Sequence, residues 1–136
     1  MFLLDTNILS ELRKGARADE RVRSWFGLRD DADLFLSVLV AGELRQGVER
    51  VRLRDAAQAE HLDRWLRRLI DDYTERLLPV DERVAELWGR LNVPDPISTV
   101  DGLLAATAIV HGLTLVTRDV KPVQHTGARL LNPFDV

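Results

Sequence analysis

The chain alternates from end to end between short apolar runs typical of buried strands and longer segments with helical spacing. Strands are expected at residues 2–4, 34–37, 77–80, 113–117 and 128–131. Helices are expected at residues 6–14, 19–28, 40–51, 55–73, 81–91 and 99–111. Such alternation is the signature of a parallel sheet covered by helices. The sequence therefore predicts an α/β fold with a central, mainly parallel sheet.

Two helical regions carry further information about packing. The segments 40–51 and 55–73 follow each other closely, and the apolar positions of the second recur at spacings of three and four, which predicts a helical hairpin. Residues 99–111 are apolar nearly all round, so this helix is expected to be buried on most sides. Gly112 then stands where a helix commonly ends.

Size and composition narrow the class of protein. A chain of 136 residues suits one domain, taken here as residues 1–136. Without cysteine, any metal must be held by oxygen ligands or by three scattered histidines. No apolar run approaches the roughly 18 residues of a membrane span, and the apolar start is too short for a signal peptide, so we expect a cytoplasmic protein with no membrane contact. The net charge of −3 argues against a general nucleic-acid coat protein but does not exclude a nuclease.

Four carboxylates stand where the predicted strands end. Asp5 comes directly after the first strand, and Asp119 follows the strand at 113–117. Glu43 lies about one turn into the helix after the second strand, and Asp101 lies in the first turn of the apolar helix. Because ligand sites in open parallel sheets lie outside the carboxyl ends of the strands, these four acids are expected to converge.

Convergence of four acids would require a compensating charge. Two like charges about 4 Å apart repel by about 4 kcal/mol at an effective dielectric constant near 20. Mg²⁺ or Mn²⁺ prefers carboxylate oxygens and retained water, so one or two such ions suit this set of side chains.

Each acid also has a purely structural explanation when it is taken alone. Asp5 could accept the backbone N–H of Asn7, and Glu43 could simply complement a helix dipole. The spacing of Ser98 and Asp101 fits a helix capping box, and Asp119 could pair with its neighbour Arg118. Only the combination of the four favours a metal site.

Four motifs together resemble the PIN-domain family, and most closely its VapC-type toxins, the ribonucleases of toxin–antitoxin pairs. They are LLDTNILSEL, LSVLVAGELRQG, STVDGLLAATAIVHGLTLVTRD and ARLLNPF, in family order between residues 2 and 134. The resemblance implies a three-layer α/β/α domain with four to five strands and a helical hairpin. It also implies endoribonuclease activity that depends on Mg²⁺ or Mn²⁺.

The resemblance assigns roles to particular positions. Asp5, Glu43, Asp101 and Asp119 fall on the acidic quartet of the family, as catalytic residues and metal ligands. The supporting polar positions are Thr6, Asn7, Ser37 and Thr117. Relatives often carry Thr-x-Asn followed by a later aspartate, whereas here Asp119 takes the Asn place and Pro122 the later one. Whether Asp119 binds metal directly or through water is therefore open.

Basic residues near these motifs are candidate contacts for the phosphates of RNA. They are Arg13, Lys14, Arg45 and Arg118. An ordinary solvated surface charge explains each of them equally well.

The resemblance also implies protein partners. One partner is a second copy of the chain, which would form a homodimer. The other is a cognate antitoxin, which would bind the dimer in a heterotetramer or larger assembly. The hairpin at residues 40–73, with Trp65, is the expected antitoxin groove.

Other classes of protein remain as alternatives. They are a housekeeping PIN nuclease without an antitoxin and a non-catalytic PIN-fold binding module. Receiver domains and dehalogenase-like phosphatases fit less well, because Asp5-Thr6-Asn7 has neither adjacent acids nor Asp-x-Asp.

Overall fold

The strand β1 (Phe2–Leu4) forms the centre of a five-stranded parallel sheet in the computed structural model, which describes residues 1–136. The strand order is β3-β2-β1-β4-β5. The bounds of the other strands are Leu34–Ser37 for β2, Leu77–Leu78 for β3, Thr114–Val116 for β4 and Arg129–Leu131 for β5. Every neighbouring pair is parallel, which confirms the predicted sheet.

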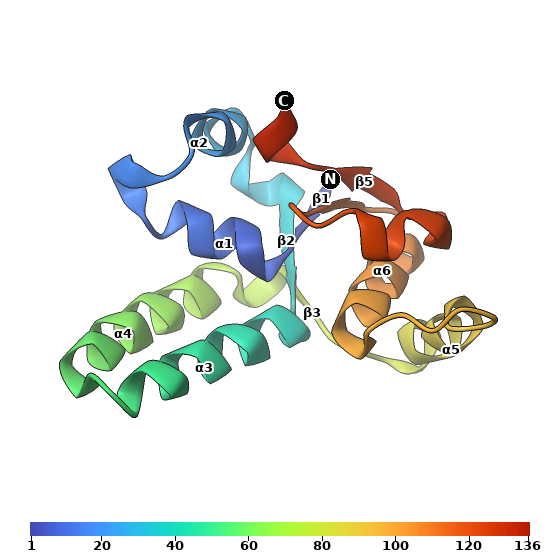
Figure 1. The fold of residues 1–136 in the computed structure, drawn as a ribbon. Helices are drawn as coiled ribbons and strands as arrows, with labels where there is room; N and C mark the ends of the chain where they lie inside the picture. Colours follow the sequence, from blue (N-terminus) through green and yellow to red (C-terminus); the bar gives the residue numbers. More distant parts are fainter.

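Six α-helices cover the sheet. Their bounds are Thr6–Leu12 for α1, Glu20–Gly27 for α2, Val38–Arg52 for α3, Ala56–Asp72 for α4, Glu82–Leu91 for α5 and Thr99–His111 for α6. In Figure 1 the helices α1 and α2 and, below them, the pair α3 with α4 lie on the left of the strands, and the pair α5 with α6 lies at the lower right. The three-layer architecture and the hairpin of α3 and α4 are thus confirmed. None of these helices is long and apolar enough to cross a bilayer.

Several element boundaries differ from the sequence prediction. α3 begins at Val38 rather than Val40, because the hydroxyl of Ser37 accepts the backbone N–H of Leu39 and caps the helix. β3 stops at Leu78, and the following Pro79 has no N–H to extend the ladder. α1 ends at Leu12, two residues early, and a short 3₁₀ turn follows at Gly15–Arg17.

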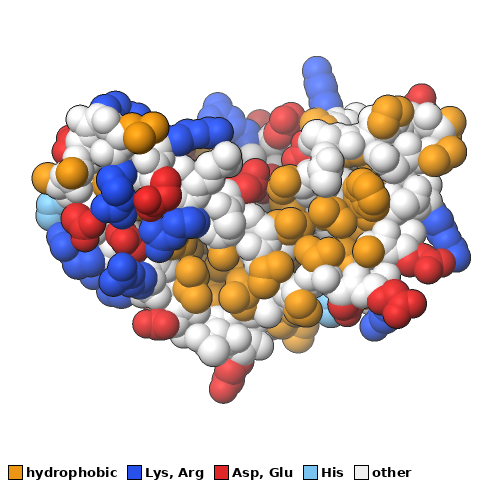
Figure 2. Space-filling model, turned by 90° about the horizontal axis from the view of Figure 1, so that it is seen from below, with side chains coloured by type: hydrophobic (Ala, Val, Ile, Leu, Met, Phe, Trp, Pro, Cys, Tyr) orange, Lys and Arg blue, Asp and Glu red, His pale blue; other side chains and the backbone are white.

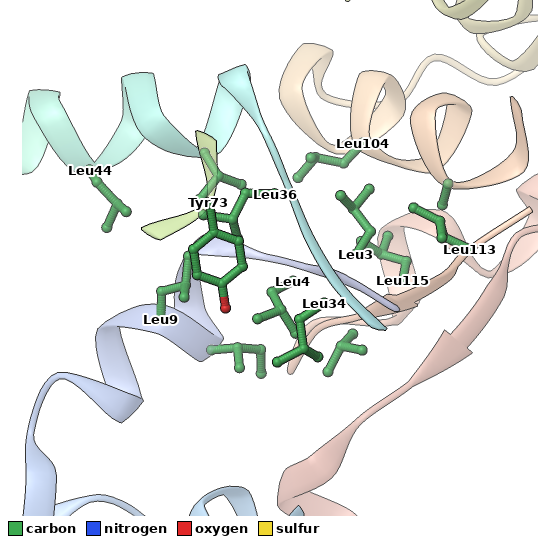
Figure 3. Packing of buried hydrophobic residues seen from close by; sticks show 14 of the residues in the cluster. Leu3, Leu4, Leu9, Leu34, Leu36, Leu44, Tyr73, Leu104, Leu113 and Leu115 are labelled. Atoms are coloured by element: carbon green, nitrogen blue, oxygen red, sulfur yellow. The ribbon is translucent and has the colours of Figure 1, made fainter. Parts of the chain in front are cut away.

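The core lies on both sides of β1. Leu3 and Leu4 are each 0% exposed, and successive strand residues point to opposite faces. Figure 3 shows Leu3 beside Leu104 of α6 and Leu115 of β4, and Leu4 beside Leu34 of β2 on the other face. α6 is buried along most of its length, as expected, and ends at Gly112, which has a φ of 66°. This packing fixes the ends of β1, β2 and β4.

A buried acid joins the two helices of the hairpin. Asp63 of α4 is 5% exposed and accepts ion pairs from Arg45 at 2.8 Å, Arg67 at 3.1 Å and Arg52 at 3.3 Å. Figure 2, which views the molecule from below, shows basic and acidic side chains interleaved on the side that carries the hairpin. The hydrogen bond from Arg45 and the charges of all three arginines hold the pKa of Asp63 below its ordinary value.

Replacing Asp63 by Asn is expected to lower the melting temperature at pH 7, because three arginines lose the negative charge that they share. The stabilisation is fully present above the unfolded pKa of about 3.9 and is lost as the pH falls through the lower folded value. The difference between variant and wild type should therefore shrink on acidification. Thermal unfolding followed by circular dichroism across this range measures it. Asp71→Asn, an exposed acid of the same helix, is the control; equal effects of the two variants would contradict the role of Asp63.

Candidate active site

The four acids of the sequence prediction line one cavity at the carboxyl edge of the sheet. Asp5 follows β1, Asp119 follows β4, Glu43 lies on α3 after β2, and Asp101 lies in the first turn of α6. The cavity has a volume of about 490 Å³, and none of its ten lining residues is hydrophobic. The convergence arises because β1 pairs with both β2 and β4, which brings their ends together.

Asp5 is held firmly at the end of β1. Its Oδ1 accepts the backbone N–H of Thr6 at 2.7 Å, so it caps α1, and its Oδ2 accepts the hydroxyl of Thr117 at 2.8 Å. Burial raises the pKa of this carboxyl above its ordinary value. The hydrogen bonds from Thr117 and Thr6 lower the pKa in part, and the charges of Glu43 and Asp101 raise it further. The cavity therefore concentrates negative charge around a half-buried acid.

Hydroxyl groups orient two of the other acids. Thr6 donates its hydroxyl to Oε1 of Glu43 at 2.6 Å, across 37 positions in the chain. Ser98 donates to Oδ2 of Asp101 at 2.5 Å and makes no side-chain cap to the helix backbone. The capping box that was the alternative explanation of Asp101 is therefore not formed by the Ser98 side chain, which instead orients the Asp101 carboxylate.

Thr117 links the loop after β4 to α1. Besides donating to Asp5, its hydroxyl oxygen accepts the side-chain amide of Asn7 at 3.3 Å and the backbone N–H of Asp119 at 3.2 Å. Asn7 in turn accepts the backbone N–H of Arg118 at 3.2 Å. The structure thus places Asn7 and Thr117 in contact with the site.

Ser37 makes no side-chain hydrogen bond to the acids and does not line the cavity. It is 0% exposed and caps α3, the helix that carries Glu43. Its contact with the cavity is indirect, through the position at which α3 begins.

The four candidate basic residues separate into two groups. Arg13 and Lys14, at the end of α1, line the acid cavity. Arg45 instead pairs with Asp63 and Glu49, and the guanidinium of Arg118 lies 4.4 Å from the centre of the Phe134 ring. Neither Arg45 nor Arg118 is among the residues that line the cavity.

Two further residues line the cavity and were not predicted from the sequence, Ser10 and Glu11. Glu11 is 9% exposed, accepts Lys14 Nζ at 3.0 Å and accepts the backbone N–H of Asp19 at 2.8 Å. Both follow Asn7 at helical spacings of three and four, so the face of α1 that carries Asn7 could have revealed them.

The donor atoms of the cavity suit a hard divalent cation. The acids that line the cavity offer carboxylate oxygens, which are the ligands that Mg²⁺ and Mn²⁺ prefer. The negative charges of Glu43 and Asp101 also act on Asp5, and a bound cation would compensate them. No three Asp, Glu or His side chains form a ready ion-binding cluster. Mg²⁺ is usually held by one or two carboxylates together with water and substrate phosphate, so the residues present fit such an ion without a closed cage.

Fold and site together define a class of protein. A family model described as PIN domain matches residues 2–127, and the chain belongs to that family. The chain is 32% identical over 139 residues to the toxin FitB of Neisseria gonorrhoeae, a match that covers 98% of this chain and 99% of FitB. It is also 32% identical over 143 residues to the VapC ribonuclease Y4jK of Sinorhizobium fredii, with 99% of each covered. The crystal structure of FitAcB from Neisseria gonorrhoeae matches it with a TM-score of 0.90 and 32% identity over 100% of both chains.

Proposed function

We propose that the chain is a Mg²⁺- or Mn²⁺-dependent endoribonuclease that acts as the toxin of a type II toxin–antitoxin module. The observation that carries this proposal is the half-buried Asp5, whose pKa is raised, in a cavity that it shares with Glu43, Asp101 and Asp119. The similarity to a protein named VapC ribonuclease supports RNA as the substrate. The similarity to the toxin FitB supports the role of a toxin.

Asp5 and Asp101 would be the main ligands of the cation, with Glu43 and Asp119 holding a second ion or orienting the attacking water. When bound, the cation would lower the pKa of its water and neutralise charge on the phosphate. Thr6 and Thr117 keep the carboxylates in place, so they need not reorganise during the reaction. Arg13 and Lys14 provide positive charge at the cavity for the neighbouring phosphates.

Two surfaces suit the proposed protein partners. A groove of about 460 Å³ between α1, α2 and α4 is lined by six hydrophobic residues, which suits the apolar side of an antitoxin segment. Figure 2 shows an apolar area in the middle of the lower face. Val38, Leu39 and Val100 line a shallow hollow between the starts of α3 and α6. We assign that area to a homodimer, which would join antitoxins in a heterotetramer or larger assembly.

The direct test is incubation of the purified protein with total RNA. Cleavage is expected with Mg²⁺ or Mn²⁺, should stop in excess EDTA, and should return when Mn²⁺ is added back. Gel electrophoresis of the RNA with end mapping measures this. Cleavage that persists unchanged in EDTA would contradict the metal requirement.

The same samples distinguish the alternatives. No cleavage under any condition, together with no heat on titration with Mn²⁺, would favour a non-catalytic binding module. Cleavage by a protein whose gene has no neighbouring gene for a small DNA-binding antitoxin would favour a housekeeping nuclease.

A further inference from the structure

A second, smaller cavity opens directly from the acid cavity. It has a volume of about 290 Å³ and lies between α1 and the hairpin of α3 and α4. The two cavities share four residues, which are Thr6, Ser10, Arg13 and Glu43. A ligand bound at the acids therefore has immediate access to this second cavity, which we call the side slot.

The lining of the side slot differs in chemistry from that of the acid cavity. Its apolar residues are Leu44, Val48, Val51, Leu62 and Trp65, whereas the acid cavity has no hydrophobic residue. Gly47 also lines the slot, and a Cβ built there would have no heavy atom within 4 Å. The slot is thus an open apolar space beside a charged one. RNA presents the same alternation, because each charged phosphate is flanked by flat bases.

Arg13 stands at the junction of the two cavities. Its guanidinium lies 5.9 Å from the centre of the Trp65 ring. No hydrogen bond or ion pair within the protein involves its side chain, so its donors are available to a ligand. Arginine binds phosphate through two parallel hydrogen bonds, and both its plane and the indole ring stack on bases.

We infer that the side slot takes one nucleobase of the RNA, next to the phosphate held at the acids, and this rests on the proposed ribonuclease function. Trp65 provides the stacking surface, and Arg13 spans base and phosphate. A base suits the slot better than a protein segment does, because the slot is smaller than the groove between α1, α2 and α4 and shares four lining residues with the acid cavity. A peptide has the larger groove between α1, α2 and α4 available, which lies next to the slot and shares Arg13 and Trp65 with it.

The test fills the slot without disturbing the acids. In Gly47→Leu the new side chain projects from α3 into the open space, and the helix should not lose stability, since leucine favours helix more than glycine does. Gly89→Leu is the matched control, because Gly89 is an exposed glycine of α5 with equally open space around its Cβ. Trp65→Leu is a second variant that removes the stacking surface instead.

The substrate is an oligoribonucleotide around a mapped cleavage site, either intact or with an abasic nucleotide on one side of the scissile phosphate. For the wild type, removing the base is expected to raise KM by about tenfold, in line with the usual contribution of one stacked base. On intact RNA, Gly47→Leu and Trp65→Leu should each have a KM about tenfold above that of the wild type. Replacing the base by the abasic nucleotide should not raise the KM of these two variants further. Gly89→Leu should behave as the wild type, and kcat should change little throughout.

Other outcomes would overturn the inference in distinguishable ways. If Gly47→Leu cleaves intact RNA with the KM of the wild type, no base occupies the slot. If Gly47→Leu keeps the KM of the wild type but no longer binds a protein partner that the wild type binds, the slot is a binding site for that partner. If the abasic change costs Gly47→Leu as much as it costs the wild type, the base lies elsewhere. If the wild type cleaves no RNA, the proposed function itself fails, whatever the variants do.

Discussion

The Asp5→Asn variant is expected to lose RNA cleavage by at least about a thousandfold, because the proposed cation and its attacking water would lose a half-buried charged ligand. The fold should remain intact. The amide oxygen can still accept the N–H of Thr6, and removing one charge relieves repulsion from Glu43 and Asp101. Cleavage of the mapped oligoribonucleotide at saturating Mn²⁺ and a thermal melt measure the two effects.

Asp95→Asn provides the control for charge alone. Asp95 is an exposed acid in the loop before α6 and does not line the acid cavity. This variant should cleave RNA as fast as the wild type. Full activity of Asp5→Asn would refute the assignment of the site, and loss of activity accompanied by unfolding would show that Asp5 serves the structure instead.

The largest effect on stability is expected for Leu3→Ala, at about 2–5 kcal/mol of unfolding free energy. Leu3 is 0% exposed in the central strand, next to Leu104 and Leu115, so truncation leaves a cavity between the sheet and α6 (Figure 3). Urea denaturation followed by circular dichroism measures the change.

The comparison variant is Leu53→Ala, which removes the same atoms at the turn between α3 and α4, where the side chain is 90% exposed. It should change the unfolding free energy by less than about 0.5 kcal/mol. Similar losses for Leu3 and Leu53 would contradict the placement of the core around β1.

The order of strands and helices could be predicted because each has a strong local pattern. α6 is apolar nearly all round and ends at a glycine in the left-handed conformation, so its burial and its last residue could both be predicted. The predicted start of α3 was wrong because Val38 and Leu39 are apolar and continue the apolar pattern of β2. Only the contact between the Ser37 hydroxyl and the N–H of Leu39 marks the transition.

The positions of the acids could be predicted because they depend on strand ends, which the sequence marks well. The directions of the basic side chains could not. Arg45 stands two residues from Glu43 but turns to Asp63, a partner 18 positions away on the other helix of the hairpin. Such a pairing depends on how two helices pack, and neither helix alone indicates it.

The central claim is that the convergent carboxylates hold a divalent cation, and anomalous diffraction from crystals soaked in Mn²⁺ tests it most directly. An anomalous peak is expected in the acid cavity beside the carboxylates of Asp5 and Asp101, and no such peak is expected in crystals of Asp5→Asn. A wild-type map without a peak there, from protein that cleaves RNA when Mn²⁺ is supplied, would contradict it.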